Sequence, residues 1–166
     1  MSRRRDGTIG NDELAGLAPP DERIAAGPVA VVECVENIPC NPCVGACPRG
    51  AITIDGDINE LPAVDAELCN GCGLCVSACP GLAIFVIDAS AGEEAATVSL
   101  PYEYVPLPRE GEEVVGLDRQ GRPVCDAVVT RVLSSKALDR TPVVTLTLPR
   151  EHVMTVRHFQ RKAESP

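Results

Sequence analysis

Apolar residues occur along the chain in short runs that suit strands better than long helices. Residues 29–32 are all apolar, which is typical of a buried strand. Further on, Val144, Leu146 and Leu148 alternate with threonines, the period-two pattern of a half-buried strand. Pro149 is expected to end that strand, because proline cannot donate to a ladder of hydrogen bonds.

The C-terminal part of the chain continues this β pattern and then changes period. Residues 112–117 and 122–133 predict two strands, joined at residues 118–121 by a turn with aspartate first and glycine last. Residues 151–162 predict a short closing helix instead. Its apolar residues would share one helical face: Val153, Val156 and Phe159.

The N-terminal part contains an internal repeat built around cysteine. Residues 43–48 and 75–80 share the pattern Cys-x-x-x-Cys-Pro, and each copy leads into a short apolar strand, at residues 51–55 and 83–88. Two copies of one unit imply pseudo-twofold symmetry. We therefore expect the two short strands to lie beside one another.

Composition shows that the core needs support. Apolar residues make up 45% of the 166, but aromatic residues only 2%, with no tryptophan. Small cores of this kind are often stabilised by disulfides or metals, and the nine cysteines could serve either purpose. Compartment decides between the two.

The chain shows no export signal, which favours metal over disulfides. Arg3, Arg4 and Arg5 are followed by polar residues where a leader needs an apolar stretch. The longest apolar run, residues 82–87, falls far short of the roughly 20 residues of a membrane span. We expect a cytoplasmic protein with reduced thiols.

Charge is distributed unevenly between the two halves. Residues 1–97 carry 15 acidic and 5 basic side chains, whereas residues 98–166 carry 9 and 10. The cysteine-rich half is therefore strongly acidic, which argues against nucleic acid as a partner and suits either a basic protein surface or solubility alone.

Four segments follow from these patterns. Residues 1–27 are predicted to form an N-terminal arm, and residues 28–90 a cysteine-rich domain. Residues 91–109 form a proline-rich linker, and residues 110–166 a small β module with the short C-terminal helix.

The cysteines fall into two groups with nearly the same spacing. The second group reads Cys69-x2-Cys72-x2-Cys75-x3-Cys79-Pro80, the spacing of bacterial-type ferredoxins with two [4Fe-4S] clusters. The first group reads Cys34-x5-Cys40-x2-Cys43-x3-Cys47-Pro48 and differs by three extra residues after its first cysteine. Gly71 and Gly73 provide the positive φ angles that a tight loop around a cluster needs.

Residues 28–88 thus resemble the bacterial-type two-cluster ferredoxin domain. The resemblance implies an α+β fold with pseudo-twofold symmetry, here followed by the β-rich, barrel-like C-terminal module. It also implies two [4Fe-4S] clusters, with the fourth cysteine of each group ligating the other cluster. Cluster one would be held by Cys34, Cys40, Cys43 and Cys79. Cluster two would be held by Cys69, Cys72, Cys75 and Cys47.

Two alternatives remain open at this stage. Because of the extra residues in its group, Cys34 could pack as a small apolar side chain, and cluster one would then keep three thiolates. Structural zinc could be held by two Cys-x2-Cys pairs, but it would leave four cysteines unused. A radical enzyme that binds S-adenosylmethionine is disfavoured. Such enzymes space their three cysteines x3 and then x2, whereas in this chain x3 comes last.

The remaining candidate residues lack a motif. Cys125 lies in a predicted strand and is expected to be a buried apolar residue, and His152 and His158 are expected at the surface. The sequence contains no glycine-rich dinucleotide fingerprint, no phosphate loop and no clear acid–base pair. No catalytic site is predicted in this chain.

Residues 33–43 are also similar to small iron–sulfur subunits of multi-subunit flavin dehydrogenases that act on proline-like or opine-like amines. This resemblance implies an electron-transfer subunit in a hetero-oligomer with a flavin-containing subunit. The alternative is a non-redox assembly module in which clusters or zinc act as structural staples.

Overall fold

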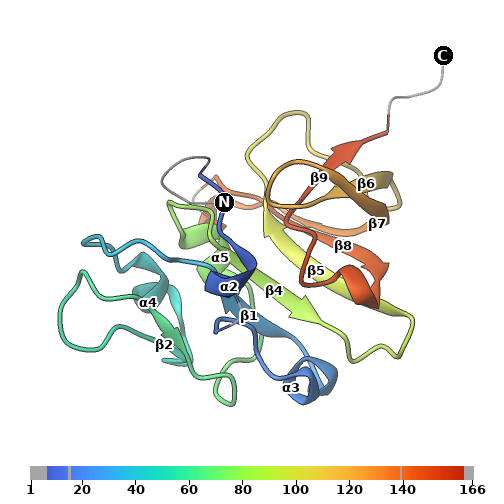
Figure 1. The fold of residues 1–166 in the computed structure, drawn as a ribbon. Helices are drawn as coiled ribbons and strands as arrows, with labels where there is room; N and C mark the ends of the chain where they lie inside the picture. The colour runs from blue at the N-terminus through green and yellow to red at the C-terminus, as the bar shows by residue number, and fades with distance from the viewer. Residues whose placement is uncertain (1–6, 15, 139, 163–166) are drawn as a thin grey trace.

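A computed structural model of the chain describes residues 7–14, 16–138 and 140–162. Its largest element is an antiparallel sheet of seven strands in the order β1-β4-β5-β8-β7-β6-β9 (Figure 1). The strands are β1 (Val29–Val32), β4 (Ile84–Asp88), β5 (Ala95–Pro101), β6 (Glu113–Leu117), β7 (Pro123–Leu133), β8 (Val143–Pro149) and β9 (His158–Arg161).

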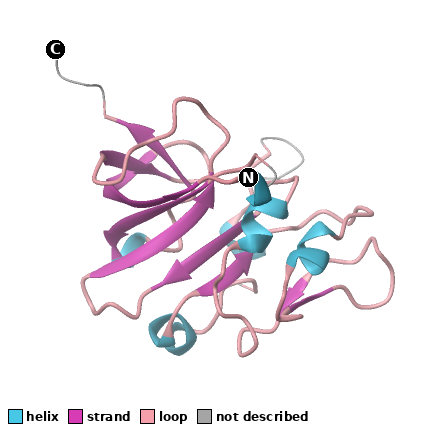
Figure 2. Ribbon diagram, turned by 180° about the vertical axis from the view of Figure 1, so that it is seen from behind, coloured by secondary structure: helices cyan, strands magenta, loops and turns pink. Residues whose placement is uncertain are grey.

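A smaller layer carries the cysteines beside one end of this sheet. It holds the helices α4 (Pro42–Ala46) and α5 (Leu74–Ala78), which contact each other, and a hairpin of β2 (Ile52–Thr53) and β3 (Ala63–Val64). Figure 2 shows the larger strands gathered on one side and this small hairpin on the other. The other helical elements are α2 (Asn11–Leu14), α3 (Asp21–Ala26), η1 (Lys136–Leu138) and η2 (Arg150–His152).

Strands β1 and β4 are buried on both faces and separate two cores. Alternate side chains of a strand point to opposite faces. Val31 and Phe85 therefore join the main core under the C-terminal strands, whereas Val32 and Ile84 join a second core that contains the cysteines. The two strands physically link the cysteine layer to the rest of the sheet.

Several sequence predictions are confirmed. Residues 29–32 form β1, and β8 shows the predicted alternation of burial at Val144, Leu146 and Leu148. The turn at residues 118–121 is closed by a hydrogen bond from the Gly121 N–H to the Asp118 carbonyl, at 3.0 Å.

The predicted pairing of the two short strands is wrong. The strand after the first repeat, β2, pairs with β3, whereas the strand after the second repeat, β4, pairs with β1 and β5. Both edges of β4 are thus occupied, and no edge is left for β2.

The predicted C-terminal helix at residues 151–162 is also wrong. Those residues form part of η2 and then β9, which pairs with β6. The three apolar side chains that suggested a helical face are all buried in the main core, although the segment is not a helix. These are Val153, Val156 and Phe159.

The sheet runs through the segment predicted as a linker. Strand β5 lies within residues 91–109 and pairs with β4 on one side and β8 on the other. Residues 28–90 and 110–166 are therefore joined by continuous main-chain hydrogen bonding. Within the ranges that the structure describes, no helix is long and apolar enough to cross a membrane.

Candidate iron–sulfur site

The two cysteine repeats fold into matching helix ends. Helices α4 and α5 are both five residues long, and the cysteine that follows each one is extended, with φ/ψ of −82°/105° at Cys47 and −79°/111° at Cys79. A proline disfavours helical geometry in the residue before it, so Pro48 and Pro80 explain why both helices stop there. Each fourth cysteine is thereby directed away from its own helix.

One set of thiols gathers around Cys43. Burial raises the pKa of Cys43, and the neighbouring thiols of Cys79 and Cys40 raise it further. The pKa of Cys34 is raised mainly by burial, and again by Cys79 and Cys40. Cys79 of the second group therefore lies close enough to the thiols of the first group to affect their pKa.

A second set gathers around Cys75. Burial raises the pKa of Cys75 to about 12, with further contributions from the thiols of Cys69, Cys72 and Cys47. This set again takes three thiols from one group and one from the other. A metal centre binding here must displace the proton of a buried thiol, which the charge of a bound cation makes favourable.

Main-chain N–H groups point at three of the thiol sulfurs. Ala51 donates to Cys47 Sγ at 3.3 Å, and the repeat-related Ala83 donates to Cys79 Sγ at 3.4 Å. Ala30, on β1, donates to Cys69 Sγ at 3.3 Å. Hydrogen bonds to cysteine sulfur stabilise thiolate ligands and influence the potential of a cluster, so the donor set fits an iron–sulfur centre.

Cys47 shows the effect on acidity. Burial alone would raise its pKa, but N–H groups of the following residues outweigh burial and lower it. The donors belong to Arg49, Gly50, Ala51 and Ile52. Such a concave array of N–H groups favours an anion, here a thiolate.

The core around the thiols is apolar. Ile52, Val76 and Ile84 are almost completely buried there, and Val44 packs against them. Cys72 is the one exposed thiol of the eight, whereas Cys43 and Cys75 are buried. In the described ranges, no group of three His, Cys, Asp or Glu side chains could hold a single metal ion.

Gly71 and Gly73 have φ angles of +65° and +80°, which confirms the predicted loop geometry. At Gly71, an added Cβ would lie 2.4 Å from the Cβ of Pro28. The loop of the second group therefore packs tightly against the start of β1, and only glycine fits.

Arg23 also holds this second loop, although the sequence analysis assigned it only to the N-terminal arm. Its guanidinium donates to the carbonyls of Ala66 and Cys69, both at 2.7 Å, and to those of Gly27 and Pro28 at 3.0 and 3.1 Å. No local sequence signal distinguishes it, because its partners lie up to 46 residues away.

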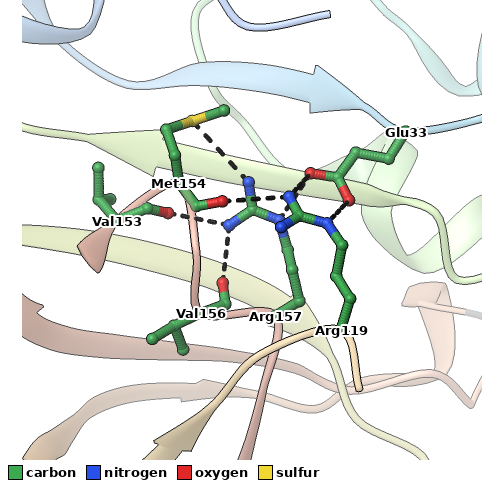
Figure 3. Close-up of polar contacts among 6 residues, drawn as sticks. All are labelled: Glu33, Arg119, Val153, Met154, Val156 and Arg157. Atoms are coloured by element: carbon green, nitrogen blue, oxygen red, sulfur yellow. Dashed lines mark hydrogen bonds and ion pairs between the residues drawn. The ribbon is translucent and has the colours of Figure 1, made fainter. Parts of the chain in front are cut away.

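A buried cluster of charges lies beside the first group (Figure 3). Glu33, which directly precedes Cys34, forms ion pairs with Arg119 and Arg157. Burial would raise the pKa of Glu33, but the two arginines outweigh it and lower it. Burial lowers the pKa of Arg157 to about 10; the neighbouring Arg119 also lowers it, whereas Glu33 raises it. Glu33 and Arg157 are therefore both charged at neutral pH.

The arginines of the C-terminal segment form contacts within the chain. Arg157 is buried against Glu33, and Arg150 donates to the carbonyls of Ala89 and Gly92, both at 2.8 Å. Arg161 pairs with Glu112. These arginines therefore stabilise the chain itself.

Cys125 packs on the main core rather than in the core of the thiols, but it is less buried than expected. The pKa of Cys125 is raised mainly by burial and then by Asp126 and Glu151. His158 is half-buried among Tyr102, Tyr104 and Phe159, so its expected surface position is wrong.

Comparison with known protein families identifies the class of this site. Residues 62–85 match the family described as "4Fe-4S binding domain", a segment that includes the whole second cysteine group. This segment of the chain therefore resembles a ferredoxin-type 4Fe-4S binding domain.

Three curated relatives extend this picture. The chain is 43% identical over 54 residues to "Aliphatic sulfonate oxidoreductase, polyferredoxin-like subunit" of Pyrococcus furiosus, covering 32% of this chain and 28% of that protein. It is 36% identical over 61 residues to "Ferredoxin-type protein NapF" of Haemophilus influenzae, covering 36% and 35%. It is 30% identical over 127 residues to "Protein Pixie" of Drosophila melanogaster, covering 70% and 19%.

The chain thus spans only about a fifth to a third of the length of these relatives. No solved structure matches the chain significantly.

Proposed function

We propose that this chain relays single electrons through two [4Fe-4S] clusters. Cluster one would be held by Cys34, Cys40, Cys43 and Cys79, and cluster two by Cys69, Cys72, Cys75 and Cys47. The observation that carries the proposal is the grouping of thiols, in which Cys79 is an electrostatic neighbour of Cys43, and Cys47 of Cys75. When bound, each cubane supplies one-electron chemistry, taking up one electron and giving one back.

The residues of the chain hold and shield these centres. The N–H groups of Ala51 and Ala83 stabilise the two thiolates that cross between the groups. The buried side chains of Ile52, Val76 and Ile84 exclude water, which keeps negative charge poorly solvated and the potential low. The exposed Cys72 gives cluster two an edge at the surface where electrons can enter or leave.

The fold class belongs to the same proposal. The matching helices α4 and α5 support an α+β ferredoxin-like domain with pseudo-twofold symmetry. The five strands from β5 to β9 support a β-rich module after it, and a barrel-like form of that module is part of the proposal.

The partner we propose is a flavin-containing oxidoreductase subunit in a hetero-oligomer. One relative is named as a subunit of an oxidoreductase. Dehydrogenation of an organic substrate releases two electrons, and a flavin can deliver them singly to one-electron centres. Reduced thiols also favour a cytoplasmic location.

Metal content tests the two-cluster proposal directly. Anaerobically reconstituted chain should hold about eight iron and eight sulfide. Cys79→Ala should damage the cluster bound by Cys34, Cys40 and Cys43, although it lies in the other group. Iron in the matched control Cys125→Ala should stay unchanged, because Cys125 lies outside both thiol sets.

Three results would count against this function. Zinc without sulfide would exclude the clusters, and a Cys79→Ala variant that disturbed only the centre of Cys69, Cys72 and Cys75 would exclude the crossed ligation. Clusters that dithionite cannot reduce would favour a structural staple. The flavin partner is tested by purifying the intact complex from its native source, where about one flavin per chain is expected.

A further inference from the structure

Two buried charged side chains, Glu33 and Arg157, and the partly buried Arg119 meet in one group (Figure 3). The side chains of Glu33 and Arg157 are 4% and 3% exposed, and that of Arg119 is 16% exposed. Arg157 Nε donates to Glu33 Oε1 at 2.7 Å, and Arg119 Nε donates to Oε2 at 2.8 Å. Both carboxylate oxygens of Glu33 thus accept a hydrogen bond from an arginine.

Both arginines also donate to main-chain carbonyls. Arg157 Nη1 donates to the carbonyls of Val153 and Val156 at 2.9 and 2.7 Å, and Arg119 Nη2 donates to that of Met154 at 3.1 Å. The Arg157 guanidinium carbon lies 4.8 Å from the centre of the Phe85 ring. The Glu33 carboxylate and the Arg157 guanidinium are therefore held in fixed positions in a largely buried site.

This group of charges is connected to two of the four proposed ligands of cluster one, Cys34 and Cys79. Glu33 is covalently joined to Cys34, and its N–H donates to the Ala83 carbonyl at 2.8 Å. The N–H of the same Ala83 donates to Cys79 Sγ at 3.4 Å. One residue thus links the C-terminal strands to two of the four proposed ligands.

The charges do not cancel. Two guanidinium groups, which stay protonated at neutral pH, face one carboxylate. The three side chains together therefore carry a net charge of about +1. A charge in a poorly hydrated site acts over longer distances than one in water. A nearby positive charge stabilises a reduced iron–sulfur centre more than an oxidised one, because the reduced form is more negative.

We propose that Glu33, Arg119 and Arg157 are positioning residues whose net positive charge raises the reduction potential of cluster one relative to cluster two. This inference rests on the proposed two-cluster function. The C-terminal part of the chain would then do more than cover the cysteine layer. It would favour reduction of cluster one over reduction of cluster two.

The test is a pair of substitutions with opposite expected signs in the full-length, cluster-loaded chain. Arg119→Gln removes one positive charge and should lower the midpoint of cluster one. Glu33→Gln removes the negative charge and should raise it. Each change should alter the ratio of reduced to oxidised cluster roughly tenfold at a fixed potential, which is about 59 mV for one electron.

Two controls isolate the effect. Arg119→Lys retains the charge and should keep the midpoint near that of the parent chain. Arg122→Gln removes a positive charge three residues away, from a side chain that is 70% exposed and pairs with Asp118, and should leave both midpoints unchanged. Midpoints are read by redox titration with electron paramagnetic resonance, and Cys72→Ser identifies the cluster-two signal by changing it.

The outcomes separate this inference from the proposed function. Opposite shifts confined to cluster one support it. Shifts of the same sign in both variants, as general loosening of the site would give, or no shift beyond that of Arg122→Gln, overturn it while leaving the two-cluster relay intact. A chain that binds fewer than two clusters overturns both.

Discussion

The two cysteine groups carry the same repeat, but different ends of the chain hold them in place. The second group is held by residues that precede it, through Arg23 and the packing of Gly71 on Pro28. The first group is anchored by residues that follow it, Arg119 and Arg157, which pair with Glu33 directly before Cys34. The internal repeat therefore determines the conformation of each cysteine loop, but not which residues elsewhere in the chain hold that loop in place.

The largest expected effect comes from breaking the support of the first group. Arg157→Met leaves the buried Glu33 with one partner fewer, and breaking a buried ion pair costs about 3–5 kcal/mol. We expect the free energy of unfolding of the loaded chain to fall by about that amount in denaturant titrations. A loss no larger than that of the exposed Arg122→Gln, at most about 1 kcal/mol, would show that Glu33 is not an anchor.

A smaller effect is expected from the packing of the second loop. Gly71→Ala forces a side chain into a positive φ, which costs about 1–3 kcal/mol, and brings its Cβ against Pro28. Iron analysis should show preferential loss of cluster two, up to about four of eight iron. Gly45→Ala is the matched control, because an added Cβ there meets nothing within 4 Å; equal iron loss in both variants would refute the packing argument.

The smallest effect is expected at Arg23. Arg23→Gln removes most of its hydrogen bonds to main-chain carbonyls, but the side chain is only partly buried, so a loss of about 1–2 kcal/mol is expected. The variant should release iron from cluster two faster under a chelator while cluster one is unaffected. Faster release from cluster one instead would contradict the division of supports between the two groups.

Local features of the fold and site were predictable from sequence, because they depend on neighbouring residues. Cysteine spacing and the prolines after Cys47 and Cys79 indicated the two loops, and Gly71 and Gly73 have the positive φ angles expected of them. The alternation in β8 is likewise a property of one strand.

Long-range features were not predictable in this way. Glu33 finds its partners 86 and 124 residues away, and nothing near any of the three residues marks the pairing. The helical spacing of Val153, Val156 and Phe159 was misleading, because β9 gains more from pairing with β6 than from continuing a helix. Tertiary pairing overrides local periodicity in such short segments.

The anchor of the first group has a consequence for biosynthesis. All eight proposed ligands, and Arg23, have left the ribosome once Cys79 has emerged, but Arg157 emerges 78 residues later. At about 5–20 residues per second, that delay is about 4–16 s. During this interval the nascent chain has the means to close the second cysteine loop, whereas Glu33 still lacks its partners. We therefore expect the support of the first cysteine group to form after that of the second.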